Sequence, residues 1–175
     1  MPRYEVITHR EHSIRVYRQR RRSLVMKSTP IGLVMFVPHR ANVDGEQVRK
    51  FIDEALRTIG DRIAPINAPI VTTPTQLRSM TAHWAEQMGV EPQRISVRDM
   101  FRKWGSCSKT GSISLNTALC RVPRPLAEYV ICHELAHLVE FNHGKGFKSL
   151  MDRHMPDWRE REASLQAWMI GGTLD

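Results

Sequence analysis

PLAEYVICHELAHLVEFNHGKGF, residues 125–147, contains the sequence His-Glu-Leu-Ala-His. On a helix, His133 and His137 lie one turn apart on the same face, which is the spacing that two ligands of one zinc ion need. Glu134 projects beside them, where a carboxylate can hold a metal-bound water and take its proton. The surrounding residues are apolar on every side, which predicts a buried helix. Buried histidines and a buried carboxylate need a partner, and a metal ion is a suitable one.

A third ligand is expected, because catalytic zinc usually takes three protein ligands and leaves a position for water. His143 is the first candidate, but in an unbroken helix it would point away from the face that carries His137. The sequence therefore predicts that the helix ends before His143. Asn142 tolerates the left-handed conformation, and Gly144 and Gly146 follow, so we expect the chain to turn His143 back towards the other two histidines.

Three carboxylates are alternatives to consider for the third ligand. Glu140 falls on the ligand face but lies about 10 Å along the helix axis from His133, so we expect it beside the site or in solvent. Glu160 and Glu162, in a helix predicted after the motif, are the runner-up ligands.

Three segments together resemble a known family. They are WGSCS at 104–108, ISLN at 113–116 and HELAHLVEFNHGKGF at 133–147. In this combination the chain is similar to the YgjP-like metallopeptidase domain, a relative of the WLM and SprT-like zinc peptidases. The resemblance covers most of the chain. One departure is Phe147-Lys148, where the family pattern has an aromatic pair, and it concerns the wall beside the third ligand.

The resemblance implies a zincin-like fold with zinc bound by His133, His137 and His143. It also implies that Glu134 is the general base.

The composition is that of an ordinary globular domain. The chain has 175 residues, 41% hydrophobic and 25% charged, which suits a single domain over residues 1–175. It lacks an apolar run long enough to cross a membrane, and its amino terminus lacks the apolar core of a signal peptide. Three cysteines, an odd number, favour a reducing compartment over a disulfide framework. We therefore expect a cytoplasmic protein with no membrane partner.

Positive charge is concentrated near the amino terminus. Residues 1–27 carry eight Arg or Lys and two Glu, so they hold six of the eight excess positive charges of this basic protein. A cluster of this kind attracts polyanions, and weak binding of nucleic acid or nucleotides through the arginine-rich region is a candidate property. The alternative is that these residues form the solvated face of a sheet.

Patterning predicts an α+β fold, in which a twisted mixed sheet packs on the motif helix and a carboxy-terminal helix braces the site. A basic β-meander is expected within residues 1–40, and a catalytic core within 95–170. The predicted strands are 13–17, 24–26, 32–37 and 95–99, with a hairpin formed by 100–106 and 112–116. The predicted helices are 44–59, 75–88 and 156–169, and 61–73 is predicted to be a connecting loop.

The function that the residues favour is zinc-dependent hydrolysis of a peptide bond, with Glu134 as general base. A second group that stabilises the oxyanion is expected, and Tyr129 and His154 are candidates. Cys107 is interpreted as a packing residue rather than a nucleophile, because free cysteines are usually small buried hydrophobes.

Three other functions are alternatives to this one. A metal-dependent nucleoside triphosphate pyrophosphatase would use the same metal, but the chain has no glycine-rich phosphate loop. A peptidase acting on DNA-bound proteins would account for the basic amino terminus. A nucleic-acid-binding module with structural zinc is disfavoured by Glu134, because a structural site needs no such carboxylate.

Overall fold

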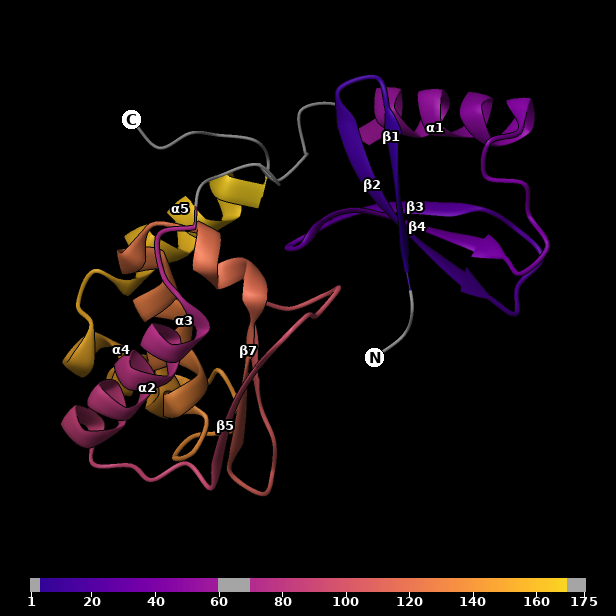
Figure 1. Cartoon of the computed structure of the whole chain (residues 1–175). Helices are drawn as coiled ribbons and strands as arrows, with labels where there is room; N and C mark the ends of the chain where they lie inside the picture. The colour runs from indigo at the N-terminus through magenta and orange to yellow at the C-terminus, as the bar shows by residue number, and fades with distance from the viewer. Residues whose placement is uncertain (1–3, 60–69, 170–175) are drawn as a thin grey trace.

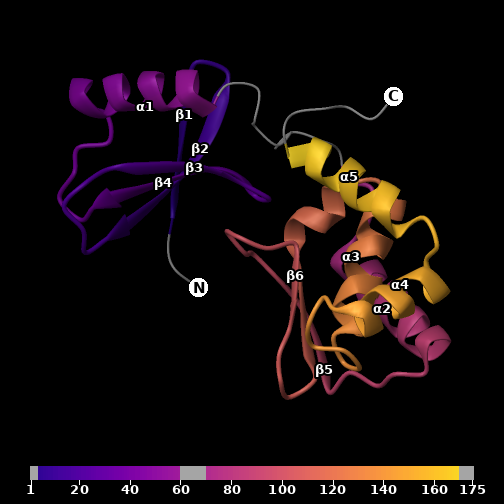
Figure 2. The ribbon, with the colours of Figure 1, turned by 180° about the vertical axis from the view of Figure 1, so that it is seen from behind.

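The computed structural model describes residues 4–59 and 70–169. Most of the loop predicted over 61–73 lies outside these ranges. The described chain forms an amino-terminal part and a carboxy-terminal part, which lie side by side in both ribbon views (Figure 1, Figure 2).

The amino-terminal part is a four-stranded sheet with one helix against it (Figure 1). Its strands are β1 (Glu5–His9), β2 (His12–Gln19), β3 (Val25–Thr29) and β4 (Gly32–Pro38), in the order β1-β2-β4-β3. Helix α1 (Glu46–Ile59) contributes the buried Val48 and Ile52 to the core beneath this sheet.

The prediction of a meander within residues 1–40 is wrong in its strand order. β4 lies between β2 and β3, and it runs parallel to β2. The cause is the apolar sequence GLVMFVP, five residues of which are fully buried or nearly so on both faces. A strand buried on both faces needs neighbours on both edges, whereas β3 carries the exposed Lys27 and takes the edge.

The carboxy-terminal part begins with α2 (Pro74–Met88), which confirms the helix predicted over 75–88. Thr73 caps its amino end, and Gly89 ends it in the left-handed conformation at φ 65°. A second sheet follows, formed by β5 (Arg94–Arg98), β6 (Gly105–Cys107) and β7 (Ser112–Asn116) in the order β5-β7-β6. β5 is parallel to β7, whereas β6 and β7 form the predicted antiparallel hairpin, which turns at Gly111. The bounds predicted for its first strand, 100–106, are wrong, because that strand covers only 105–107 and a loop precedes it.

The motif helix is α3 (Arg124–Ala136), and a short 3-10 helix η1 (Thr117–Arg121) leads into it. Tyr129, Val130, Ile131 and Cys132 are all buried, which confirms a helix that is apolar on every side. Helix α4 (Lys145–His154) was not predicted, and α5 (Trp158–Met169) begins close to the predicted start of the last helix. Contacts of α3 with α2, α4 and α5 enclose it (Figure 2).

Aromatic side chains join the two parts. Phe101, in the loop before β6, packs edge-on against Tyr17 of β2 and Phe36 of β4, with ring centroids 4.8 and 5.7 Å apart. Arg15 forms an ion pair with Asp99 at 3.3 Å across the same junction. The amino-terminal sheet therefore supports the loop that leads into β6.

The α+β class is confirmed, with the strands divided between two mixed sheets rather than one. Within the described ranges, the helices are too short or too polar for any of them to span a membrane. The predicted limits of the catalytic core and the cytoplasmic location stay predictions.

Candidate metal centre

Three histidines converge at the carboxyl end of α3. The Nε2 atom of His133 lies 3.2 Å from that of His137 and 3.0 Å from that of His143. Two nitrogens held about 2.0–2.1 Å from one tetrahedral zinc ion would be about 3.3 Å apart, so this spacing fits such an ion. Within the residues that the structure describes, these three form a group whose ligand atoms all lie within 4.8 Å of one another.

The chain reaches His143 by a tighter route than the sequence predicts. Helix α3 ends at Ala136, and His137 is its cap residue, still in right-handed helical conformation. The next turn is closed by hydrogen bonds from Leu138 N–H to the Leu135 carbonyl at 3.0 Å and from Glu140 N–H to the Ala136 carbonyl at 2.9 Å. Asn142 does not adopt the left-handed conformation that it would tolerate, because Arg10 is the one described non-glycine residue with positive φ. The chain turns towards His143 through a tightened last helical turn instead of through a left-handed residue.

Phe147 forms the floor under the histidines. Its ring centroid lies 4.9 Å from that of His133, 4.8 Å from His137 and 4.7 Å from His143. The side chain is 1% exposed and belongs to α4, the helix that pattern reading missed. Of the pair Phe147-Lys148, the residue that keeps the aromatic character of the family pattern therefore packs against all three candidate ligands.

The outer nitrogens of two imidazoles are also held. His137 Nδ1 lies 3.1 Å from the Glu140 carbonyl, and His133 Nδ1 lies 3.5 Å from the Tyr129 hydroxyl. Tyr129 in turn donates a hydrogen bond to Glu162 Oε1 at 3.0 Å. An acceptor at Nδ1 fixes the tautomer that leaves Nε2 free to bind a metal.

Burial keeps these imidazoles neutral. Desolvation, followed by the proximity of His137 and His143, lowers the pKa of His133 from 6.5 to about 4. Desolvation also lowers the pKa of His137. Neutral imidazoles with converging lone pairs are the form that a metal ion requires, so the residues present fit the ion.

Glu134 lies beside the group and is 7% exposed. Burial raises its pKa from 4.5 to about 7, against the opposing effects of the Lys103 charge and of a hydrogen bond from the Cys107 backbone N–H. The carboxylate packs on Gly105 of β6, where a Cβ atom would lie 2.6 Å from Oε1. A base with a pKa near 7 is well matched to proton transfer at neutral pH.

The other residues considered from the sequence lie elsewhere. Glu162 accepts the Tyr129 hydrogen bond, and Glu160 is exposed on α5. Glu140 packs on Gly146, where a Cβ atom would lie 2.5 Å from its Oε1. Within the described ranges, the group of candidate ligands holds no carboxylate.

A cleft of about 340 Å³ opens over the group. The histidines and Glu134 form one wall, Gly105 to Cys107 of β6 form another, and Lys103 and Phe141 complete the lining. Cys107 is in the lining, and its thiol contacts the Ser108 carbonyl at 3.4 Å. Burial, followed by the Glu134 charge, raises the pKa of this thiol, which keeps it protonated.

Lys103 is a residue that the pattern did not single out. Its backbone carbonyl accepts a hydrogen bond from Nδ2 of Asn116, which also donates to the Met100 carbonyl, each at 2.7 Å. Asn116 is fully buried, so the loop before β6 is anchored from within. The side chain that holds Lys103 in place lies thirteen residues further along the chain, so no local sequence pattern indicates where Lys103 lies.

The chain belongs to the YgjP-like metallopeptidase domain family, whose sequence model matches residues 6–167. The resemblance noted from the motifs is thereby confirmed, and membership implies a metal-dependent hydrolase. A search of curated proteins finds no match.

Two solved structures are similar over about half of this chain. The zymogen of the metallopeptidase abylysin from Pyrococcus abyssi is 22% identical, with a TM-score of 0.48 over 52% of this chain and 92% of that chain. The zymogen of the metallopeptidase jannalysin from Methanocaldococcus jannaschii is 24% identical, with a TM-score of 0.46 over 51% and 92% of the two chains.

Proposed function

We propose that this protein is a zinc-dependent metallopeptidase that hydrolyses peptide bonds, with Glu134 as general base. The observation that carries the proposal is the convergence of three imidazoles beside a buried carboxylate in an open cleft. Membership of a metallopeptidase family supports peptide or protein substrates.

His133, His137 and His143 would hold the metal. Zinc, when bound, supplies a Lewis acid that lowers the pKa of water to about 7 and stabilises charge on a carbonyl oxygen. An all-imidazole set suits zinc better than magnesium or calcium, which prefer oxygen ligands. Phe147 keeps the side of the imidazoles opposite the cleft apolar and closed to solvent.

Glu134 takes the proton from the attacking water and passes it to the leaving amine. The Cys107 N–H orients the carboxylate, and Gly105 gives it room. Burial by itself would leave much of the acid protonated at pH 7. The Lys103 charge and the Cys107 hydrogen bond oppose this effect and keep a fraction available as the base.

Lys103 is our candidate for the second group that stabilises the oxyanion. It is the lysine that lines the cleft, and its charge acts on Glu134. Tyr129 is less suitable, because its hydroxyl is already bonded to Glu162. His154, at the end of α4, is outside the cleft lining. A fixed cation aimed at developing negative charge is an effective stabiliser in a partly desolvated site.

The free edge of β6 supports an extended peptide as substrate. Hydrogen bonds from Asn116 N–H to the Trp104 carbonyl, and from Ser108 N–H to the Ser112 carbonyl, direct the even-numbered residues towards β7. The backbone groups of Gly105 and Cys107 therefore face away from β7, on the cleft side. The Cys107 N–H there already donates to Glu134, so the Gly105 N–H and the two carbonyls are the groups with which a substrate would pair. An extended peptide can add to such an edge.

A metal-dependent nucleoside triphosphate pyrophosphatase is the second candidate. Lys103 favours it, because an ammonium group in the cleft would also attract phosphate. The same residues would then direct water to phosphorus instead of carbon, so activity on the two substrate classes separates the candidates.

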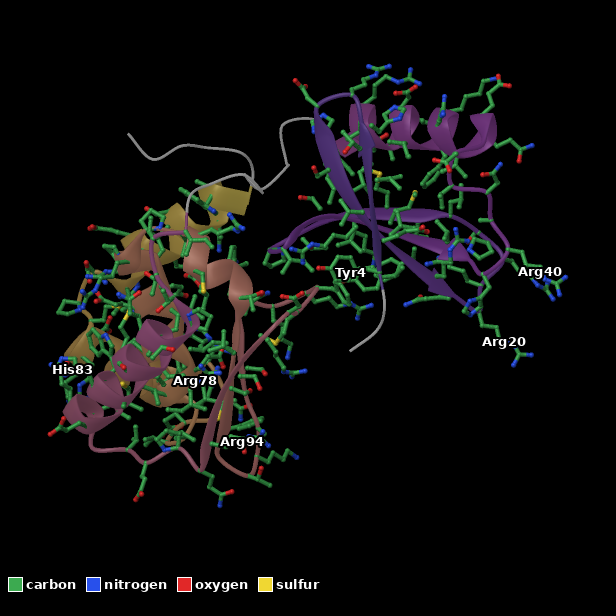
Figure 3. The ribbon with its side chains drawn as sticks, viewed as in Figure 1. Tyr4, Arg20, Arg40, Arg78, His83 and Arg94 are labelled. Carbon is green, nitrogen blue, oxygen red and sulfur yellow. The ribbon has the colours of Figure 1, made fainter. Side chains whose placement is uncertain are left out.

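Weak polyanion binding by the amino-terminal part is a proposed accessory property. Because β2 and β4 are parallel and Gln19 pairs with Pro38, Arg18 and Arg20 lie beside His39 and Arg40. Figure 3 shows Arg20 and Arg40 projecting together at one end of the sheet. Such a surface would support association with DNA or RNA, and the zinc would then be catalytic rather than part of a structural nucleic-acid-binding module.

The decisive experiment measures zinc content and hydrolysis in the wild type and in Glu134→Gln. We expect the variant to keep about one zinc per chain and to lose between about 10² and 10⁴ in kcat on unfolded protein substrates. Glu160→Gln, an exposed residue of α5, is the matched control and should retain activity. Pyrophosphate release from nucleotides that requires Glu134, with no proteolysis, would establish the second candidate instead.

A further inference from the structure

A second cavity, of about 250 Å³, lies next to the cleft. α3 and α5 form its sides, through Val130 and Leu165 among others, and Trp104 closes it from the loop before β6. These side chains make the walls mainly apolar. The cavity thus has room for a side chain, and its walls suit a long aliphatic stem.

This cavity meets the cleft at the candidate reaction centre. Gly105, His133 and Glu134 belong to the linings of both. A peptide whose bond lies over Glu134 would therefore present the side chain of a residue adjoining that bond to the second cavity. The cavity can therefore determine which side chain is accepted at that position of the substrate.

Two carboxylates line the cavity, and Glu162 is the one that the proposed reaction does not use. Its Oε1 accepts the Tyr129 hydroxyl at 3.0 Å, which fixes the carboxylate and leaves the other oxygen for a further partner. The neighbouring Arg161 is turned to Asp157 and Glu128. Among the described residues, the cavity lining contains no lysine or arginine. A carboxylate in a mainly apolar cavity without a cation favours a cationic ligand.

We propose that the second cavity binds the side chain of a lysine or arginine next to the cleaved bond, with Glu162 receiving its positive end. The substrates would then be basic peptide segments. This inference rests on the proposed peptidase function. Gln166, also in the lining, adds a neutral hydrogen-bonding group beside the carboxylate.

The test uses zinc-loaded full-length protein and peptides that differ at one residue, placed on either side of the cleaved bond. Lysine or arginine should give a kcat/KM about tenfold or more above that for norleucine, and glutamate should give the lowest value. Glu162→Gln keeps an acceptor for Tyr129 but removes the charge, so the preference for lysine over norleucine should fall towards one. Glu160→Gln, the exposed control on the same helix, should keep the preference. The ratio of two substrates does not depend on the fraction of enzyme that holds zinc.

Binding supplies a readout that needs no turnover. The inactive Glu134→Gln protein should bind the lysine peptide more tightly than the norleucine peptide, and adding Glu162→Gln should remove the difference. Cleavage without basic preference, or a preference that survives Glu162→Gln, would overturn the inference and leave the peptidase proposal standing. If no peptide is cleaved, the peptidase proposal fails, and equal binding of the two peptides would overturn the inference as well.

Discussion

Gly105 and Glu134 fit together without space for one additional carbon atom. A Cβ atom on Gly105 would lie 2.6 Å from both Cγ and Oε1 of Glu134. Gly105 belongs to edge strand β6 and is buried, whereas Glu134 belongs to α3, so the contact joins the sheet to the motif helix. The glycine of the WGSCS segment therefore sets the distance between the candidate base and the strand that borders the cleft.

Replacing Gly105 by alanine should displace Glu134 and abolish hydrolysis. The close approach involves the carboxyl group and Cγ, so either the side chain or β6 has to move, at a cost of about 1–3 kcal/mol in stability. Gly144→Ala is a matched control, because a Cβ atom there would meet nothing within 4 Å and its φ is −75°. Denaturant unfolding and kcat/KM measure both effects, and a fully active Gly105→Ala protein would contradict the account of this contact.

The raised pKa of Glu134 predicts how the stability of the metal-free protein depends on pH. Its pKa is 4.5 when unfolded and about 7 when folded, so folding favours the protonated acid. Stability should therefore fall as pH rises through this window, by at most about 3 kcal/mol. Glu134→Gln imitates the protonated acid and removes this loss.

Urea unfolding with a metal chelator at pH 4 and pH 8 measures this effect. The variant should gain stability over the wild type mainly at pH 8. His133 has the opposite dependence, because its lowered pKa costs stability as pH falls from 6.5 to about 4. That contribution is common to both proteins and cancels in their difference. A difference that is the same at both pH values would show that Glu134 is not desolvated.

His143→Ala should weaken zinc binding by about 100-fold or more. Loss of a hydrogen bond to a ligand already costs 10–100-fold in many metal sites, so loss of the ligand itself should cost at least as much. Competition with a chromogenic chelator measures the affinity. His154→Ala is the control, since His154 is not part of the group of converging nitrogens. Unchanged affinity in His143→Ala would return Glu160 and Glu162 to consideration.

The sequence was most informative where a local signal governs the structure. The four-residue spacing of His133 and His137, the apolar turn before them, and the turn at Gly111 all predicted features that the structure shows. The convergence of His143 also followed from the need to end the helix. Its role as a metal ligand, like that of the other two histidines, remains a prediction.

The position of an element relative to partners far away in the sequence could not be predicted in this way. The central position of β4 depends on which strands are available to cover it, and α4 is obscured by Gly144 and Gly146 at its start. Lys103 enters the cleft because Asn116 binds the loop, and Phe101 ties that loop to Tyr17 of the other part. None of these partners is a sequence neighbour, so periodicity carries no information about them.

Lys103→Met should lower kcat with little change in KM if the ammonium group acts on the transition state. A loss of about 10²–10³ in kcat is typical when a group that stabilises an oxyanion is removed, and Lys103→Arg should retain part of the activity. Lys109→Met, in the exposed hairpin turn, is the control. A rise in KM alone would mean that Lys103 binds the substrate without assisting the reaction.

Replacing Arg20, Arg22 and Arg40 by serine should weaken binding of nucleic acid without regard to sequence. If these arginines contact phosphates, the affinity of the wild type falls steeply with salt, and the slope of log K against log salt should decrease by about one for each arginine removed. Arg78→Ser with Arg94→Ser is the charge control, because both residues lie on the carboxy-terminal part (Figure 3). Titration of a labelled oligonucleotide at several salt concentrations gives the slopes. The cleft lies in the carboxy-terminal part, so peptide hydrolysis without nucleic acid should be the same in all these proteins. Equal salt slopes for the wild type and the triple variant would assign the arginines to a solvated sheet edge.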